Sequence, residues 1–180
     1  CLEWGLLERW DDRLRMSAPE IAPIIFDETL PVLLRQMKRL LLEYLHQKQS
    51  DPRVLAFYAD DAGDPEEAIE LYTTCSLIAE SSYDDAATAH WLDRIIAMQG
   101  ENGWRKDRCL FLQTHLRAAE MHRFLGDFRT ACTLLREALK HCGEEDDQWF
   151  WINSSLARSL SKIDPQAAYA LSLTVLREAE

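Results

Sequence analysis

Apolar side chains recur at intervals of three and four residues along most of the chain, which is the period of a helix with a buried face. Leu33, Met37, Leu40 and Tyr44 show this spacing early in the sequence. Strand-like alternation bounded by turns is not evident, so we expect an all-α fold. The pattern predicts helices over residues 31–47, 52–60, 65–80, 83–99, 104–124, 128–142, 146–162 and 165–179.

Asp-Pro pairs mark the starts of three of these helices. Asp51, Asp64 and Asp164 each precede a proline. An aspartate at the N-cap accepts a hydrogen bond from an unpaired backbone N–H. Proline at the first helical position loses nothing, because its missing N–H would have had no acceptor in the helix.

The first thirty residues carry a weaker pattern. Leu7, Trp10 and Leu14 predict a helix that ends near Met16, and Ser17–Glu20 fits a capping box. Prolines at 23 and 31 then predict a short helix and a connector over 19–30. We therefore divide the chain into an N-terminal helical segment with a connector, 1–30, and a helical array, 31–180.

The predicted helix over 104–124 has apolar residues on more than one face, which indicates packing on two sides. Such a helix is expected inside a stack of hairpins. Pairing the helices in order gives three hairpins that start at residues 65, 104 and 146, about 40 residues apart. Gly63-Asp64-Pro65 would instead suit the second helix of a pair, so the phase of the pairing stays open.

Residues 112–143 contain a recognisable set of positions. Small residues lie midway along the first helix, a Gly-Asp-aromatic turn follows, and alanines lie seven apart on the second helix: Ala118, Ala119, Gly126, Asp127, Phe128, Ala131 and Ala138. This stretch resembles one tetratricopeptide repeat. Small side chains allow two antiparallel helices to approach closely. The resemblance implies an α-solenoid of irregular repeats whose function is to bind another protein.

In that family the first helices of the repeats line a concave groove for the partner. The resemblance implies that Gln113, Leu116, Glu120 and Arg123 face this groove. The basic residues with which one subfamily holds a terminal carboxylate are missing, because Leu116 and Glu120 stand where a lysine and an asparagine would be needed. Capture of a C-terminal peptide is therefore not expected.

Charge narrows the choice of partner. The chain has 31 acidic and 20 basic residues and a formal net charge of −11, which argues against binding to nucleic acid. Residues 51–100 hold 11 acids and 2 bases, a local net charge of −9. This block, which includes Asp60 and Asp61, is either a solvated helix face or an acidic surface for a basic segment of a partner. No apolar run is long enough to span a membrane.

Candidate chemistry is sparse. His115 and His122 are seven residues apart on one predicted helix, or about 10 Å along its axis, too far to share one zinc ion. Asp84, Asp85 and His90 do not lie on one helix face, and acids at a helix start suit its dipole. Motifs for nucleophilic catalysis, phosphate binding or metalloprotease chemistry are missing. We expect no enzyme activity, metal or cofactor.

Five cysteines, an odd number without dense spacing, predict buried free thiols and a cytoplasmic protein. The chain opens on Cys1 and ends within a predicted helix, so we expect a piece of a longer protein; a mature lipoprotein is the alternative.

Three consecutive aromatic residues, Trp149, Phe150 and Trp151, open a predicted helix and cannot all face one side of it. They either pack between hairpins or anchor a partner, since tryptophan is enriched in binding hot spots.

Two functional hypotheses result. The first is a scaffold that binds a partner protein or peptide. The second rests on a resemblance to the helical sensor region of large signal-transducing ATPases that regulate transcription, which binds an inducer or inhibitor.

Overall fold

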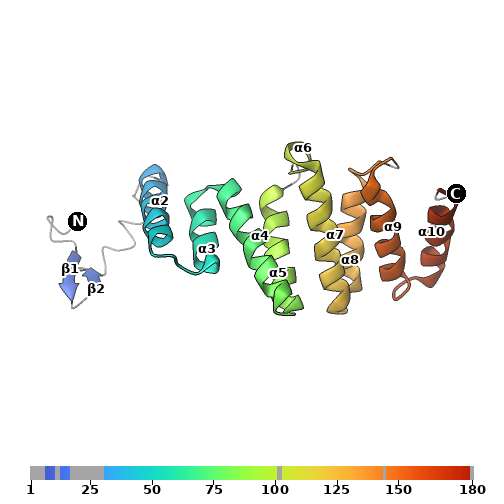
Figure 1. The fold of residues 1–180 in the computed structure, drawn as a ribbon, viewed down its shortest axis with the longest axis horizontal. Helices are drawn as coiled ribbons and strands as arrows, with labels where there is room; N and C mark the ends of the chain where they lie inside the picture. Colours follow the sequence, from blue (N-terminus) through green and yellow to red (C-terminus); the bar gives the residue numbers. More distant parts are fainter. Residues whose placement is uncertain (1–6, 11–12, 17–30, 101–102, 144, 179–180) are drawn as a thin grey trace.

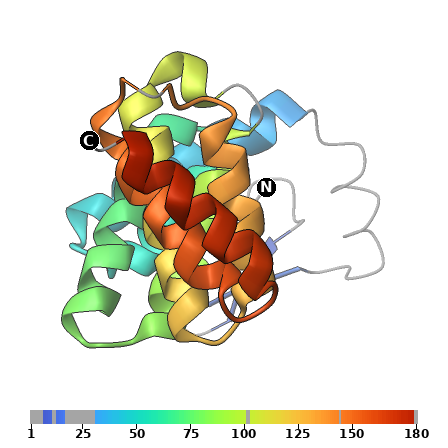
Figure 2. The same cartoon turned by 90° about the vertical axis from the view of Figure 1, so that its right-hand side faces the viewer.

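The computed structural model describes residues 7–10, 13–16, 31–100, 103–143 and 145–178. From residue 31 onward, every described element is a helix, and each helix packs on the next along one extended row (Figure 1). The helices are α2 Pro31–Gln47, α3 Pro52–Ala62, α4 Pro65–Ser81, α5 Asp85–Gln99, α6 Gly103–Lys106, α7 Arg108–Phe124, α8 Phe128–Leu139, α9 Asp147–Leu160 and α10 Pro165–Glu178. Helix α10 closes one end of the row, as the end-on view shows (Figure 2).

The N-terminal helix predicted from Leu7 to Met16 is wrong. Strands β1 Leu7–Trp10 and β2 Arg13–Met16 pair antiparallel instead, with Leu7 opposite Met16 and Trp10 opposite Arg13. Three apolar residues are too few to fix a period, and residues 13–16 also alternate basic and apolar side chains, as a strand does. The predicted capping box at 17–20 and connector at 19–30 lie outside the described residues. The division at residue 30 stays a prediction.

The predicted N-caps are confirmed. The carboxylate of Asp51 accepts a hydrogen bond from the backbone N–H of Arg53 at 2.9 Å, and that of Asp164 accepts one from Ala167 at 3.0 Å. Asp64 accepts a longer bond, 3.3 Å, from Glu67. Each bond pairs a helix-start N–H that has no acceptor within its own helix.

Some predicted helix bounds are corrected. The single helix predicted over 104–124 is divided, because the Asp107 side chain caps α7 by accepting a bond from the Leu110 N–H at 2.9 Å. Helix α5 begins at Asp85 instead of residue 83, since Tyr83 has a φ of 57° and Asp84 is the N-cap. Helix α3 continues to Ala62, where Gly63 ends it with a φ of 76°. Helix α8 ends at Leu139, three residues earlier than predicted.

Helix α7 separates two hydrophobic clusters. One cluster is built from α7, α8, α9 and α10 and includes Ala119 and Leu135. The other is built mainly from α2 to α5, and Ala118 of α7 belongs to it. Ala118 and Ala119 are both 0% exposed, although they are adjacent in sequence. The prediction that this helix packs on two sides is confirmed.

Contacts between alternate helices show which helices share a side of the row. Helix α7 packs on α9 as well as on α8. An ion pair of 2.6 Å between Glu80 and Arg117 joins α4 to α7, and one of 3.4 Å between Glu120 and Arg158 joins α7 to α9. These partners are 37 and 38 residues apart. Ion pairs therefore connect α4 to α7 and α7 to α9, and this arrangement is consistent with a helical repeat.

A larger side chain at the junction of the two clusters should destabilise the fold. We expect Ala119→Leu to lower the free energy of unfolding by about 1–3 kcal/mol, because the site has no room for three added carbons. Ala86→Leu, at an exposed position in the first turn of α5, is the matched control and should change it by less than about 0.5 kcal/mol. Urea denaturation followed by circular dichroism measures both, and equal effects would contradict this packing.

Burial of His115 should make stability depend on pH. The ring is 2% exposed, and its Nδ1 donates to the Phe111 carbonyl at 2.8 Å. Burial lowers the pKa of His115, so the unfolded chain takes up a proton at higher pH than the folded chain. This contribution to stability is complete above about pH 7 and falls as the pH drops through the lowered pKa.

The measurement is the melting temperature of the wild type and of His115→Gln from about pH 7.5 to pH 5. We expect the wild type to lose more stability on acidification than the variant, in which no buried imidazole is left to protonate. A steeper loss in the variant would contradict the assignment.

Candidate interaction surface

The two aspartates predicted to present negative charge, Asp60 and Asp61, have partners within the array. Asp60 forms an ion pair with Arg94 of α5 and accepts a hydrogen bond of 3.1 Å from the hydroxyl of Tyr72. Asp61 forms an ion pair of 2.7 Å with Lys38 of α2. Both carboxylates therefore hold neighbouring helices together, and part of their charge is offset inside the molecule.

Most other acids of the 51–100 block also have partners within the molecule. Eight of its 11 carboxylates cap a helix or pair with a basic or polar side chain: Asp51, Asp60, Asp61, Asp64, Glu67, Glu80, Asp84 and Asp93. The concentration of acids in this block thus serves mainly to join and cap helices α2 to α5 and to connect them to α7.

Three acids of the block, Glu66, Glu70 and Asp85, are exposed, and their carboxylates have no hydrogen bond or ion pair to another described residue. Glu66 and Glu70 lie one turn apart on α4. They border a cavity of about 330 Å³ between the first turns of α4, the end of α5 and the start of α7. Its apolar lining comes from Ile69, Met98 and Leu110, while Lys106 and Asp107 lie on the remaining rim. The cavity thus combines an apolar floor with two unpaired carboxylates.

The four residues implied to face a groove on α7 differ in their surroundings. Gln113 is exposed, whereas Leu116 is half-buried and packs against the cluster shared with α8 and α9. Glu120 is paired with Arg158. The guanidinium of Arg123 lies over the ring of Phe124, 4.5 Å from its centroid. Gln113 is therefore the member of this set most open to a partner.

The three aromatic residues open α9, a helix that lies further along the row than α4 (Figure 1). Trp149 is half-buried, whereas Phe150 is 43% and Trp151 is 59% exposed. The rings of Phe150 and Trp151 meet edge to face with 5.6 Å between centroids. The predicted site residues thus lie in three places: Asp60 and Asp61 on α3, the four residues from Gln113 to Arg123 along α7, and the three aromatic residues at the start of α9.

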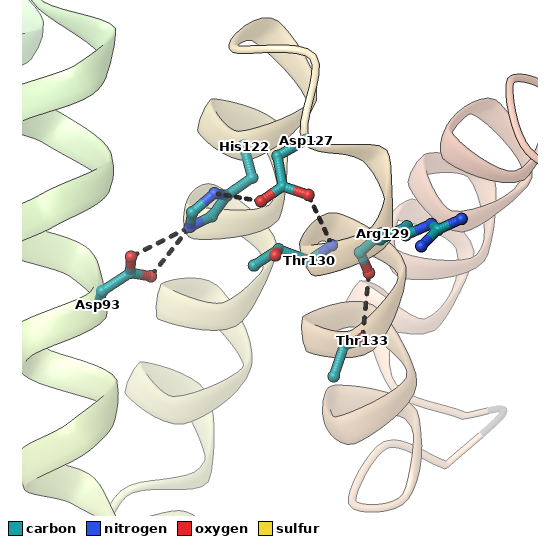
Figure 3. A network of polar contacts seen from close by, with 6 residues as sticks. All are labelled: Asp93, His122, Asp127, Arg129, Thr130 and Thr133. Carbon is teal, nitrogen blue, oxygen red and sulfur yellow. Dashed lines mark hydrogen bonds and ion pairs between the residues drawn. The ribbon is translucent and has the colours of Figure 1, made fainter.

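A polar network that the sequence did not reveal surrounds His122 near the end of α7 (Figure 3). Its Nε2 lies 3.1 Å from both carboxylate oxygens of Asp93 on α5, and its Nδ1 lies 3.9 Å from Asp127, the N-cap of α8. Hydrogen bonds from the hydroxyl and the backbone N–H of Thr130 hold the pKa of Asp127 below its usual value. The network links three helices, so His122 has a structural role.

The described residues contain no group of three or more His, Cys, Asp or Glu side chains placed to hold a metal ion. Among the helices that the structure describes, none is long and apolar enough to cross a membrane.

Cys75 and Cys132 are buried free thiols, as predicted, but Cys109 is exposed, so the expectation is wrong there. Burial raises the pKa of Cys142 to about 11. Cys1 lies outside the described residues.

Comparison with protein-family models and with curated proteins gives no match for this sequence. The evidence on function therefore comes from the surfaces described above.

Substitutions at Asp127 should separate its two interactions. Asp127→Ala removes the N-cap of α8 and the charge beside His122, and we expect a loss of about 1 kcal/mol in the free energy of unfolding, or somewhat more. Asp127→Asn keeps a capping oxygen and should cost less. Urea denaturation of both variants is the test; a cost for asparagine as large as for alanine would mean that the cap contributes nothing.

Proposed function

We propose that this chain is a protein-binding scaffold, a tetratricopeptide-like α-solenoid that binds a basic, extended segment of a partner protein beside α4 and α7. The observation that supports this proposal best is the cavity bordered by Glu66 and Glu70, two of the three acids of the block whose carboxylates have no partner among the described residues. The formal net charge of −11 supports binding to a basic protein segment over binding to nucleic acid.

The chemistry of the cavity suits lysine and arginine. Their aliphatic stems can lie on Ile69, Met98 and Leu110 while the charged group reaches a carboxylate on α4. Lys106 repels a second cation on the opposite rim and thereby favours the α4 side. A segment with basic residues separated by small or apolar ones therefore fits better than a continuous run of charge.

The arrangement of helices supports the same surface. Helices α4 and α7 are joined by the Glu80–Arg117 ion pair, which fits a repeat in which each opens a hairpin. In the family that residues 112–143 resemble, such first helices line the groove, and exposed Gln113 extends the surface along α7. Free thiols at Cys75 and Cys132 fit our proposal that the protein is cytoplasmic.

A fluorescently labelled peptide that alternates Arg or Lys with Ala and Leu tests this proposal by anisotropy. We expect the double substitution Glu66→Gln with Glu70→Gln to weaken binding about two- to thirtyfold, because an exposed ion pair contributes about 0.2–1 kcal/mol. Higher salt should weaken binding to the wild type more than to the double variant.

Asp85→Asn is the matched control, since Asp85 is also an exposed acid without a partner among the described residues and does not line the cavity. It should leave the affinity nearly unchanged. If Asp85→Asn weakens binding as much as the double variant does per carboxylate removed, binding depends only on net charge and the proposed site is wrong. A lack of binding at low salt would also reject it.

A further inference from the structure

The cavity beside Glu66 and Glu70 has a further acceptor, the side-chain amide of Gln99. Gln99 is the last residue of α5, the helix that packs on both α4 and α7 (Figure 1), and it lines the cavity. Its amide oxygen Oε1 is buried, yet no donor within the described part of the chain bonds to it. Folded proteins pair nearly all buried polar atoms, because such an oxygen has lost its bonds to water. The unpaired oxygen therefore marks a place for a donor of a bound molecule.

The charges around the cavity favour a donor that is a cation. Two unpaired carboxylates, Glu66 and Glu70, face a single base, Lys106, among the described residues of the lining. Helix α5 ends at the cavity and has no basic residue in its last turn, so nothing within that helix offsets the negative end of its dipole. The starts of α4 and α7 are positive ends, but the carboxylates of Asp64 and Asp107 cap them.

An arginine side chain matches these acceptors better than a lysine side chain does. The guanidinium group spreads five N–H donors over three nitrogens in one plane, so it can donate to a carboxylate and to a separate oxygen at once. The ammonium group of lysine places its donors on one strongly hydrated nitrogen. The apolar surface of Met98 and Leu110 also suits the more weakly hydrated guanidinium.

We propose that the cavity selects arginine over lysine, with the guanidinium donating to the α4 carboxylates and to Oε1 of Gln99. This inference rests on the proposed function, since it specifies which side chain of the basic partner segment enters the cavity. Glu66 and Glu70 supply an attraction that either base can use, whereas Gln99 supplies the acceptor that distinguishes them. Lysine in place of arginine leaves the Gln99 oxygen without its donor.

Two labelled peptides that differ only in their basic residue, Arg or Lys alternating with Ala and Leu, test this proposal by anisotropy. We expect the arginine peptide to bind about five- to twentyfold more tightly, because one added hydrogen bond contributes affinity of this order. Gln99→Met keeps an unbranched side chain and removes the amide, so it should bring the ratio of the two dissociation constants close to one. Gln166→Met, at an exposed glutamine of α10 outside the cavity, is the matched control and should leave the ratio unchanged.

The outcomes separate this inference from the proposed function. If both peptides bind the wild type equally and Glu66→Gln with Glu70→Gln weakens both, the acidic cavity stands and the selection of arginine is wrong. A preference for arginine that survives Gln99→Met would also overturn the inference, because another group would then distinguish the two bases. Absence of binding by either peptide would reject both proposals.

Stability of the protein without peptide gives an independent readout. Because the Gln99 oxygen has no donor in the described chain, Gln99→Met should leave the urea midpoint of unfolding unchanged or raise it. Circular dichroism measures this midpoint for the wild type and the variant. A clearly lower midpoint would mean that the amide stabilises the fold and would overturn its assignment to a bound arginine.

Discussion

The close approach of helices on both sides of α7 is the constraint on which the rest of the structure depends. Ala118 and Ala119 are completely buried in different clusters, so α7 must fit between α5 on one side and α8 and α9 on the other. The small side chains of Ala118 and Ala119 let the neighbouring helices come close to α7. Neither alanine can be replaced by a larger residue without moving a neighbour. Polar contacts then fix the two ends of the helix: the Asp107 side chain caps its start, and His122 ties its last turns to Asp93.

This constraint also determines where function can reside. The inner faces of the helices are used in packing, and most carboxylates of the acidic block are used in caps and ion pairs. What stays available to a partner is the outer surface, and there the cavity beside Glu66 and Glu70 joins apolar lining to unpaired charge. The proposed scaffold function therefore rests on residues that the fold does not need for its own stability.

Local signals made much of the fold predictable. Apolar periodicity located the helices from residue 31 onward, and Asp-Pro pairs fixed three of their starts, because a helix and its N-cap depend on residues within one turn. Interactions distant in sequence were not predictable: Asp60 meets Arg94 across 34 residues, and His122 meets Asp93 across 29. Within the acidic block the sequence singled out Asp60 and Asp61, which the structure pairs with Arg94 and Lys38, and gave no sign that Glu66, Glu70 and Asp85 are the acids without a side-chain partner among the described residues. The strands β1 and β2 were missed because three apolar residues at helical spacing are too few to fix a period.

Hydrogen exchange of the native protein in increasing urea tests most directly whether α7 unites the two clusters. Amides that open together belong to one cooperative unit, and terminal helices are free to open earlier. The packing of α7 between both clusters predicts that amides of α5, α7 and α8 lose protection at the same urea concentration and are among the last to exchange. If amides of α5 and α8 lost protection at clearly different urea concentrations, and α7 followed only one of these helices, α7 would not unite the two clusters.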